Sequence, residues 1–326
     1  MRPPIRAGGL LLLLSVLLAG CAAPLPNVAA TGADLPFALM GDTPYNDAEV
    51  RALDALIDDM NGQELAFVVH VGDITSGRGP CTDAWLEARQ RQYQRLRHPL
   101  ILLPGDNDWV DCHRSGFDPM ERLDKMRRLF HSGDSSIGQR TIGLERQSSN
   151  LRFAEYREHV RWIADGVVFI GLNVQGSNNN LGRTAAMDQE HARRMAAVLA
   201  WLDESMALAA ERGLAGAVIL AQANPDFEGR YRRREGVGDG FESFRTALRA
   251  HALRLGKPIL FVHGDTHMYQ QNQPLNDPAT GKPIVNFVRV EVPGSPQVRW
   301  LKAGISRERA EVFSITPAPP PTAPPY

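Results

Sequence analysis

The stretch ILFVHGDTHMY (residues 259–269) runs from a strongly apolar segment into a glycine and then an aspartate, Asp265. The same pattern occurs three more times, in FALMGDTPY at Asp42, in FVVHVGDIT at Asp73 and in LILLPGDNDW at Asp106. In open α/β sheets, ligands bind beyond the carboxyl ends of the strands. A glycine at such an end lets the backbone turn sharply or approach a neighbour closely. If the four strands are adjacent, we expect their carboxylates to converge on a small volume.

Four carboxylates in one partly dry site repel one another, and neutral pH does not protonate all of them. Bound divalent cations remove this conflict. Together with His267, two residues beyond Asp265, the aspartates are enough ligands for one or two hard or borderline metal ions. A single aspartate at a strand end is more often a helix N-cap or a turn residue. It is therefore the fourfold repetition of the pattern that favours a metal site.

The rest of the chain alternates between apolar strands and amphipathic helices, which indicates an α/β fold with helices on the faces of its sheets. The predicted strands cover residues 35–40, 65–71, 99–104, 166–174, 215–223 and 258–263, with shorter strands between 286 and 315. The predicted helices cover residues 47–60, 82–97, 185–211 and 241–254. We expect one domain over residues 33–315, followed by a proline-rich tail over residues 316–326.

The first 21 residues have the pattern of an export signal, with a basic start, an apolar run from Leu10 to Leu18 and small residues before Cys21. The apolar run is too short to cross a bilayer. The ending LAGC resembles the lipobox of bacterial lipoproteins, which implies that Cys21 becomes the lipidated N-terminus. We therefore expect a flexible spacer over residues 22–32 and a membrane-anchored domain in the bacterial cell envelope, facing the periplasm.

Composition and cysteine usage agree with an exported globular protein. The 326-residue chain is 43% hydrophobic with a formal net charge of -1, so its charge balance gives no signal for nucleic-acid binding. Without Cys21, the remaining cysteines are Cys81 and Cys112, and each lies shortly after a Gly-Asp pair. The two loops meet if their strands are neighbours, so we predict a disulfide between them, with two free thiols as the alternative.

The order of the segments GDTPY, GDIT, GDND, QAN and HGDTH resembles the calcineurin-like metallophosphoesterase superfamily over most of residues 35–270. The resemblance implies a sandwich of two mixed sheets flanked by helices. It also implies a centre of two divalent metal ions that hydrolyses phosphate esters, with a small-molecule phosphoester as the substrate. We expect the protein to be a monomer.

The usual motifs of that family are D-x-H, G-D, G-N-H-D/E, a lone histidine and G-H-x-H. The resemblance makes Asp42 the aspartate of D-x-H, Asp73 the metal-bridging aspartate and His267 the last histidine of G-H-x-H. The sequence departs from the first motif, because Pro44 stands in the place of its histidine and cannot ligate through its side chain. Tyr45 is the next residue that offers a ligand atom there.

The second metal's ligands also differ. Asp106 stands where asparagine is usual, Asp265 stands where the first histidine of G-H-x-H is usual, and Gln222 replaces the lone histidine, with Asn224 as the alternative. The resemblance thus implies mostly oxygen ligands, which favour Mg²⁺, Ca²⁺ or Mn²⁺ over Zn²⁺. We expect two divalent ions, with Mn²⁺, Mg²⁺ or Fe in preference to Zn²⁺.

The histidine of G-N-H-D/E is replaced by Asn107, which can hydrogen-bond a phosphate oxygen but cannot act as a general acid near neutral pH. His113 lies on the same loop and is a candidate proton donor, and Arg114 is a candidate phosphate ligand. Both are equally compatible with solvated loop positions. His70 and His263 precede Gly-Asp pairs on apolar strands, and we expect them to be buried structural histidines.

The resemblance implies that metal ions bridged by Asp73 activate a water molecule for attack on phosphorus. Residues 175–180 and 224–240 are the expected walls of the substrate site, and the arginines at 230 and 232–234 suit an anionic substrate. One alternative is a non-catalytic envelope protein that keeps the fold for metal or ligand binding. Another is a hydrolase of non-phosphate esters.

Overall fold

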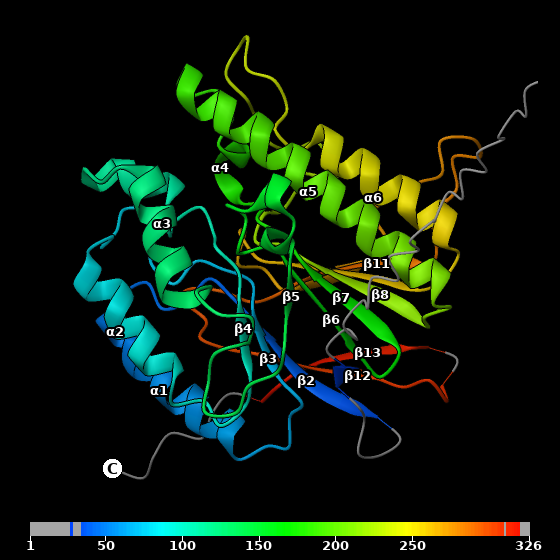
Figure 1. The fold of residues 1–326 in the computed structure, drawn as a ribbon, viewed down its shortest axis with the longest axis horizontal. Helices are drawn as coiled ribbons and strands as arrows, with labels where there is room; N and C mark the ends of the chain where they lie inside the picture. Colours follow the sequence, from blue (N-terminus) through cyan, green and yellow to red (C-terminus); the bar gives the residue numbers. More distant parts are fainter. Residues whose placement is uncertain (1–26, 29–33, 310, 320–326) are drawn as a thin grey trace, which may run out of the picture.

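Two mixed β-sheets lie face to face in the computed structural model, which describes residues 27–28, 34–309 and 311–319 (Figure 1). The five-stranded sheet has the order β13-β12-β2-β3-β4, and β2, β3 and β4 are parallel. Its strands are β2 (Leu35–Met40), β3 (Val68–His70), β4 (Leu100–Leu102), β12 (Leu301–Ile305) and β13 (Phe313–Pro317).

The eight-stranded sheet has the order β1-β6-β7-β8-β9-β11-β10, with β5 paired to β6. Its central strands β7, β8, β9 and β11 are parallel. The strands are β1 (Asn27–Val28), β5 (Glu145–Arg146), β6 (Val160–Ala164), β7 (Val167–Gly171), β8 (Gly216–Leu220), β9 (Ile259–His263), β10 (Gln270–Asn272) and β11 (Phe287–Glu291).

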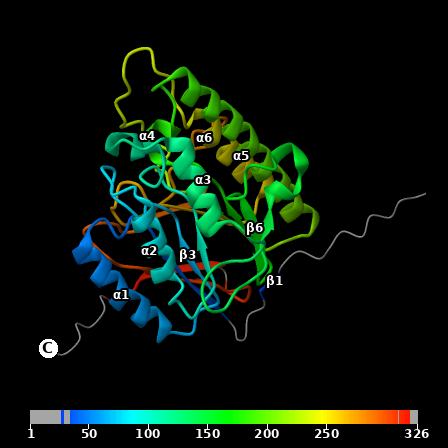
Figure 2. The ribbon, with the colours of Figure 1, turned by 60° about the vertical axis from the view of Figure 1, so that its left-hand side comes forward.

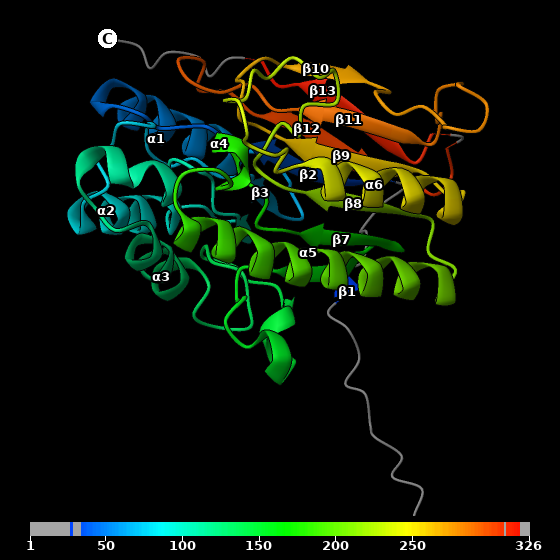
Figure 3. The ribbon, with the colours of Figure 1, turned by 90° about the horizontal axis from the view of Figure 1, so that it is seen from above.

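Helices cover the outer face of each sheet, so the fold has four layers. Helices α1 (Asp47–Asn61), α2 (Asp83–Tyr93) and α3 (Pro119–Phe130) lie on the five-stranded sheet, and Figure 2 shows them together on one side. Helices α5 (Ala185–Glu211) and α6 (Glu242–Leu255) run side by side across the other sheet (Figure 3). The short segments are α4 (Gly176–Asn179), η1 (Val110–Ser115), η2 (Gln147–Ser149) and η3 (Leu151–Phe153).

Strand β2 shows why the predicted strands are apolar without interruption. Phe37 and Leu39 point between the two sheets, while Ala38 and Met40 point to the helical layer, and all four are buried. A strand covered on both faces has no solvent side, so its sequence does not alternate. The ring of Phe37 meets Phe169 of β7 edge to face at 5.3 Å between centroids, which joins the two sheets through the core.

The predicted two-sheet α/β sandwich is confirmed, and the condition of adjacency for the four aspartate-bearing strands is met by three of them. Strands β2, β3 and β4 are neighbours in one sheet, whereas β9 lies in the other. An apolar run that is buried on both faces suits either sheet, so its sequence does not specify the sheet that it joins. The carboxylate after β9 reaches the other three because the two sheets are stacked.

Several boundaries also differ from the prediction. Helix α2 ends at Tyr93, four residues before the predicted end at Arg97, and β3 and β4 are shorter than the apolar runs that contain them. Helix α3 and strand β6 were not predicted at all. Helix α3 nevertheless carries a clear start signal, since Asp118 caps it and Pro119 is its first residue.

The ends of the expected domain differ slightly from the structure. The export signal, Cys21 and most of the expected spacer lie outside the described residues, but Asn27–Val28 pair in parallel with β6. Strand β13 extends to Pro317, and Ala318 is buried, so packing continues past the predicted boundary at residue 315. Among the helices in the described part of the chain, none is both long and apolar enough to cross a membrane.

Candidate metal centre and adjoining cavity

The four predicted aspartates meet at one end of the sandwich. Asp42, Asp73 and Asp106 directly follow the glycines at the ends of β2, β3 and β4 and are buried, while Asp265 follows β9 and is partly exposed. The backbone N–H of Asp265 donates to Asp42 Oδ1 at 3.0 Å, which links the two sheets at this point. A Cβ atom on Gly176 would lie 2.5 Å from Asp265 Oδ1 and 2.7 Å from Asp106 Oδ1, so these two oxygens are close neighbours.

Two of the glycines are required by close approach rather than by a turn. A Cβ atom on Gly264 would lie 1.9 Å from Asp42 Oδ2, and one on Gly105 would lie 2.0 Å from Asp73 Oδ1. Each glycine therefore makes room for the carboxylate of a different strand. This confirms the expectation that the glycine of the repeated pattern permits close approach.

The backbone is strained where the ligand candidates lie. Asp42, Asp73, Asp265 and His267 have φ angles of 51°, 62°, 80° and 63°, in the left-handed region that non-glycine residues rarely adopt. Such conformations cost free energy and persist where the surrounding structure holds them in place, which happens most often at functional sites. The strain thus coincides with the residues that the sequence singled out.

Burial and mutual repulsion disfavour the charged forms of these aspartates. Removal from water raises the pKa of Asp42, Asp73 and Asp265 well above the usual value, and neighbouring carboxylates raise it further. Removal from water also raises the pKa of Asp106. The cluster therefore needs either protons or cations to balance its negative charge.

Tyr45, the residue after Pro44, brings its hydroxyl into the candidate site. Its hydroxyl lies 3.2 Å from Asp73 Oδ2 and 3.0 Å from His267 Nε2, and it accepts a hydrogen bond from Asn107 Nδ2 at 3.1 Å. His267 Nε2 also lies 3.8 Å from Asp42 Oδ1. One tyrosine hydroxyl thus connects three of the residues that the sequence assigned to the site.

Gln222 lies at the centre of the site, but both ends of its amide are hydrogen-bonded. Its Nε2 donates to Asp73 Oδ2 at 3.1 Å and its Oε1 accepts from the backbone N–H of Gly176 at 2.7 Å. The alternative, Asn224, donates its backbone N–H to Asp265 Oδ2 at 3.1 Å. In this arrangement both residues orient aspartates.

Asp108 holds the loops after β3 and β4 together. It accepts hydrogen bonds from the backbone N–H groups of Asp73, Ile74 and Gly105 at 2.8–3.0 Å. Burial raises its pKa to about 7. The three backbone donors favour its charged form, so this carboxylate positions Asp73 without facing the other aspartates as a free ligand.

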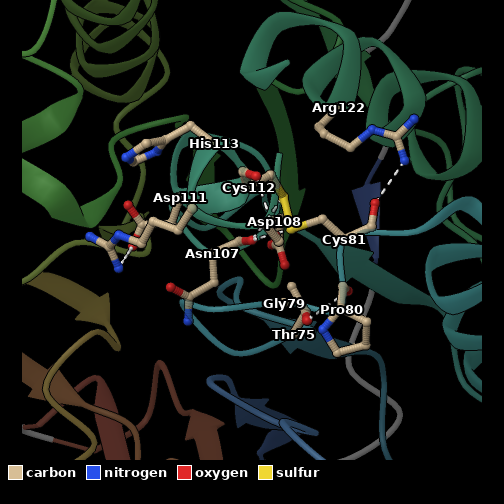
Figure 4. The surroundings of a disulfide bond; sticks show 12 residues. Thr75, Gly79, Pro80, Cys81, Asn107, Asp108, Asp111, Cys112, His113 and Arg122 are labelled. Atoms are coloured by element: carbon tan, nitrogen blue, oxygen red, sulfur yellow. Dashed lines mark hydrogen bonds and ion pairs between the residues drawn. A yellow bond between two sulfur atoms is a disulfide. The ribbon is translucent and has the colours of Figure 1, made fainter. Parts of the chain in front are cut away.

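The predicted disulfide joins the same two loops. Cys81 and Cys112 are bonded, and their Cα atoms lie 5.7 Å apart (Figure 4). The backbone carbonyl of Cys81 accepts a hydrogen bond from Arg122 of α3 at 2.8 Å. Strands β3 and β4 are parallel neighbours, which is the condition under which the two loops were expected to meet. The Arg122 hydrogen bond connects helix α3 to the bridged loops.

Asp111 is a functional candidate that was not predicted, and the contact of Ser177, from the predicted wall segment 175–180, with the aspartates was not predicted either. The Ser177 hydroxyl lies 2.8 Å from Asp106 Oδ2 and 2.9 Å from Asp111 Oδ1, and it donates to one of them at a time because it carries one proton. Burial, with the Asp106 charge next, raises the pKa of Asp111 to about 7. Asp111 lies in the loop that contains the predicted residues, and its contact with Ser177 spans 66 positions, which no local pattern reports.

Glu291, at the end of β11, was also missed. It is fully buried and accepts hydrogen bonds from the Thr266 hydroxyl, the backbone N–H of Met268 and the side chain of Gln270. It therefore fixes the loop that presents Asp265 and His267. Glu291 also ends a strand rich in apolar residues, but it is not preceded by a glycine, so the repeated pattern does not include it.

A cavity of about 650 Å³ adjoins the aspartates. Its lining includes Asp265 and Asp111, and it brings together the predicted candidates His113 and Arg114. His113 Nδ1 contacts the Val110 carbonyl at 2.8 Å, and Arg114 forms an ion pair with Asp111 at 2.5 Å. Both predicted wall segments contribute to the lining, through residues 177–178 and 231–234.

His70 and His263 are buried, as predicted. His70 Nδ1 accepts from the backbone N–H of Gly72 at 3.2 Å, and its Nε2 lies 3.1 Å from the Thr43 carbonyl oxygen. Burial lowers the pKa of His70 to about 4 and that of His263 to about 3. Both rings are therefore neutral at pH 7 and outside the set of ligand candidates.

The donor set fits a hard divalent cation. Asp42 Oδ2 and Asp106 Oδ1 are buried carboxylate oxygens without a hydrogen-bond partner in the described part of the chain, and a cation is a partner that such oxygens need. Within the same residues, no three His, Cys, Asp or Glu side chains already surround one point at ligand spacing. Both carboxylate oxygens of Asp73 accept hydrogen bonds, from the backbone N–H of Asn107 and from Gln222 Nε2.

Comparison with known proteins identifies the fold. No family model and no curated protein matches the sequence. A dimetal phosphatase from Danio rerio matches at 13% identity with a TM-score of 0.50, over 87% of this chain and 95% of the phosphatase. The structure of PhoD matches at 11% identity with a TM-score of 0.51, over 86% of this chain and 66% of PhoD. At such identities the likeness establishes the fold alone, and that fold is of the metallophosphoesterase type.

Proposed function

We propose that this chain uses its metallophosphoesterase-type fold to hydrolyse phosphate esters with two divalent metal ions. The observation that carries the proposal is the convergence of four carboxylates from two sheets, two of which keep an unpaired buried oxygen. The fold match to a dimetal phosphatase supports the same reading. The adjoining cavity gives a substrate access to the aspartates.

The residues that would hold the ions are Asp42, Asp73, Asp106, Asp265 and His267. When bound, the ions supply Lewis-acid stabilisation of the phosphoryl oxygens and lower the pKa of a bound water molecule. Oxygen donors predominate in this set, so we propose Mn²⁺, Mg²⁺ or Fe in preference to Zn²⁺. Gln222 and Asp108 orient Asp73 through hydrogen bonds to its side chain and backbone.

The remaining roles belong to polar groups beside the aspartates. Asn107 anchors its side chain on Tyr45 and its backbone N–H on Asp73, which leaves one amide proton to donate to a phosphate oxygen. His113 lines the cavity, and its Nδ1 makes the contacts with Val110 and Arg183. Its Nε2 is the nitrogen that exchanges a proton with the leaving group.

The test is hydrolysis of p-nitrophenyl phosphate and bis(p-nitrophenyl) phosphate with added Mn²⁺. We expect Asp73→Asn to lower kcat by more than about a hundredfold. Loss of a residue that only hydrogen-bonds to a metal ligand lowers activity by up to about a hundredfold, and Asp73 is itself a proposed ligand. The matched control is Asp47→Asn, because Asp47 is exposed at the start of α1, five positions from Asp42. Equal turnover by Asp73→Asn and the control would contradict the proposal, and no turnover by any form would favour a binding protein.

A further inference from the structure

We propose that the cavity beside the aspartates is a subsite for a second phosphate group, so that the ligand carries two phosphates rather than one. The inference rests on the proposed function only for the position of the first phosphate. The subsite itself is argued from the charges of the cavity, from the way its arginines are held and from its size.

Positive charge predominates in the cavity. Its lining contains five arginines and two aspartates, and the arginines are Arg114, Arg183, Arg232, Arg233 and Arg234. Two of them are neutralised by carboxylates, since Arg114 pairs with Asp111 and Arg233 pairs with Asp226 and Asp239. Arg183, Arg232 and Arg234 have no carboxylate partner among the residues that the structure describes.

Two of these three guanidinium groups are held in place without being neutralised. Arg183 Nη1 donates to the Val110 carbonyl at 2.8 Å and lies 2.7 Å from His113 Nδ1. Arg234 donates to the Gly182 carbonyl. A guanidinium carries five N–H donors, so each keeps donors for a ligand while its position is fixed. Arginine held in this way is suited to phosphate recognition.

The turn that precedes Arg183 is fastened to the segment 224–240, which carries Arg232 and Arg234. Ser177 to Asn180 form a left-handed turn with φ angles of 50–66°. Asn178 accepts from the backbone N–H of Gly240 at 3.0 Å and donates to the Gly238 carbonyl at 3.1 Å, and Asn179 donates to the Gly240 carbonyl at 2.9 Å. These bonds hold the turn against the segment that follows the arginines. The two sides of the cavity are therefore fixed relative to each other.

The size of the cavity agrees with a larger ligand. At about 650 Å³ it lies within the range of small-molecule sites, roughly 300–1,000 Å³. Ser177 reaches from the cavity to Asp106 at 2.8 Å, so a ligand with one phosphate at the aspartates extends directly into the arginine region. The excess of positive charge there is suited to a second phosphate.

The test is calorimetric titration of inorganic pyrophosphate into the full chain in detergent, after removal of metal ions by a chelator and dialysis. The cavity variant is Arg183→Gln/Arg232→Gln/Arg234→Gln. The control is Arg51→Gln/Arg212→Gln/Arg299→Gln, which removes the same charge from three exposed arginines outside the cavity lining that also lack a carboxylate partner in the described residues. This readout needs neither metal nor turnover, so it is independent of the proposed hydrolase activity.

We expect the wild type and the control to bind pyrophosphate with equal Kd, and the cavity variant to bind at least about tenfold more weakly. Equal Kd for all three forms, or equal weakening in both variants, would overturn the inference. Since Arg183 is half-buried, circular dichroism checks the fold of the cavity variant, and Arg232→Gln alone repeats the test if that variant unfolds.

Soluble and lipid-borne diphosphates share this chemistry. A water-soluble short-chain diacylglycerol pyrophosphate is therefore titrated beside inorganic pyrophosphate. If the cavity variant loses both ligands, the subsite is supported, and tighter binding of the lipid probe by the wild type assigns the source to a lipid. If the cavity variant retains both ligands, the inference fails.

Discussion

Asp42 shows how one residue joins the two sheets. Its Oδ1 accepts the backbone N–H of Asp265 from the other sheet, while its Oδ2 is buried and unpaired in the described part of the chain. The absence of a side chain on Gly264 is what admits this carboxylate. The same residue therefore stabilises the stacking of the sheets and supplies an oxygen that a cation would satisfy.

His70 gives a pH dependence at the scale of a single residue. Burial lowers its pKa from 6.5 to about 4, so the unfolded chain binds a proton more readily than the folded chain between these values. The stabilisation is complete above pH 6.5 and is lost as the pH falls towards 4. We expect His70 to contribute about 3 kcal/mol to the change in unfolding free energy over this range.

The measurement is urea unfolding of the wild type and His70→Gln from pH 7 to pH 4. The difference between the two curves isolates the histidine from the aspartates, whose raised pKa values change stability in the opposite direction over part of this range. Parallel pH curves for the two proteins would mean that His70 is not held neutral by the fold.

The disulfide-bonded loops are the element that positions Asp73 and Asn107. Cys81 and Cys112 close a segment with a sequence separation of 31, and the bridge restricts the unfolded chain. We expect Cys81→Ser/Cys112→Ser to lower the unfolding free energy by about 2–4 kcal/mol. Denaturant unfolding of the oxidised proteins measures it, with Cys21→Ser as the control that leaves the bridge intact. A double variant as stable as this control would contradict the expectation.

The sequence predicted the strands and long helices that are apolar or amphipathic throughout. It matched β2 at both ends and α5 at both ends. Strand β6 was missed because Arg161 interrupts its apolar run. That arginine is buried and is satisfied by Glu145 and Glu204 together with the ring of Trp201. Only the tertiary structure supplies these partners, so the local pattern could not reveal the strand.

In the candidate site, too, the sequence predicted the residues that a local pattern marks and missed those that depend on tertiary partners. The aspartates and His267 follow apolar strands, so a local pattern identified them, and the structure brings them together. Glu291 and the contact of Ser177 with Asp106 were missed, because both depend on partners that are distant in sequence. For Gln222 the position was predicted, but its hydrogen bonds to Gly176 and Asp73 depend on the stacking of the two sheets.

For the whole molecule, we propose anchoring to the membrane through Cys21, which lies outside the described residues. The support is the LAGC ending of the apolar N-terminal run. We expect the mature protein to carry a diacylglyceryl group on Cys21 and to fractionate with membranes, and we expect Cys21→Ser to lose both properties. Intact-mass measurement and detergent partitioning detect the change, with Cys81→Ser/Cys112→Ser as the control that stays anchored. An unmodified Cys21 in the mature protein would exclude the anchor.

The central claim is that residues at the strand ends of both sheets together bind a pair of divalent ions, mostly through oxygen atoms. Native mass spectrometry of the Mn²⁺-loaded and desalted chain tests it most directly, with Asp47→Asn as the control for Asp73→Asn. We predict two ions per chain in the wild type and in the control, and fewer in Asp73→Asn. A wild type that retains fewer than two ions, or an Asp73→Asn variant that retains both, would contradict the account.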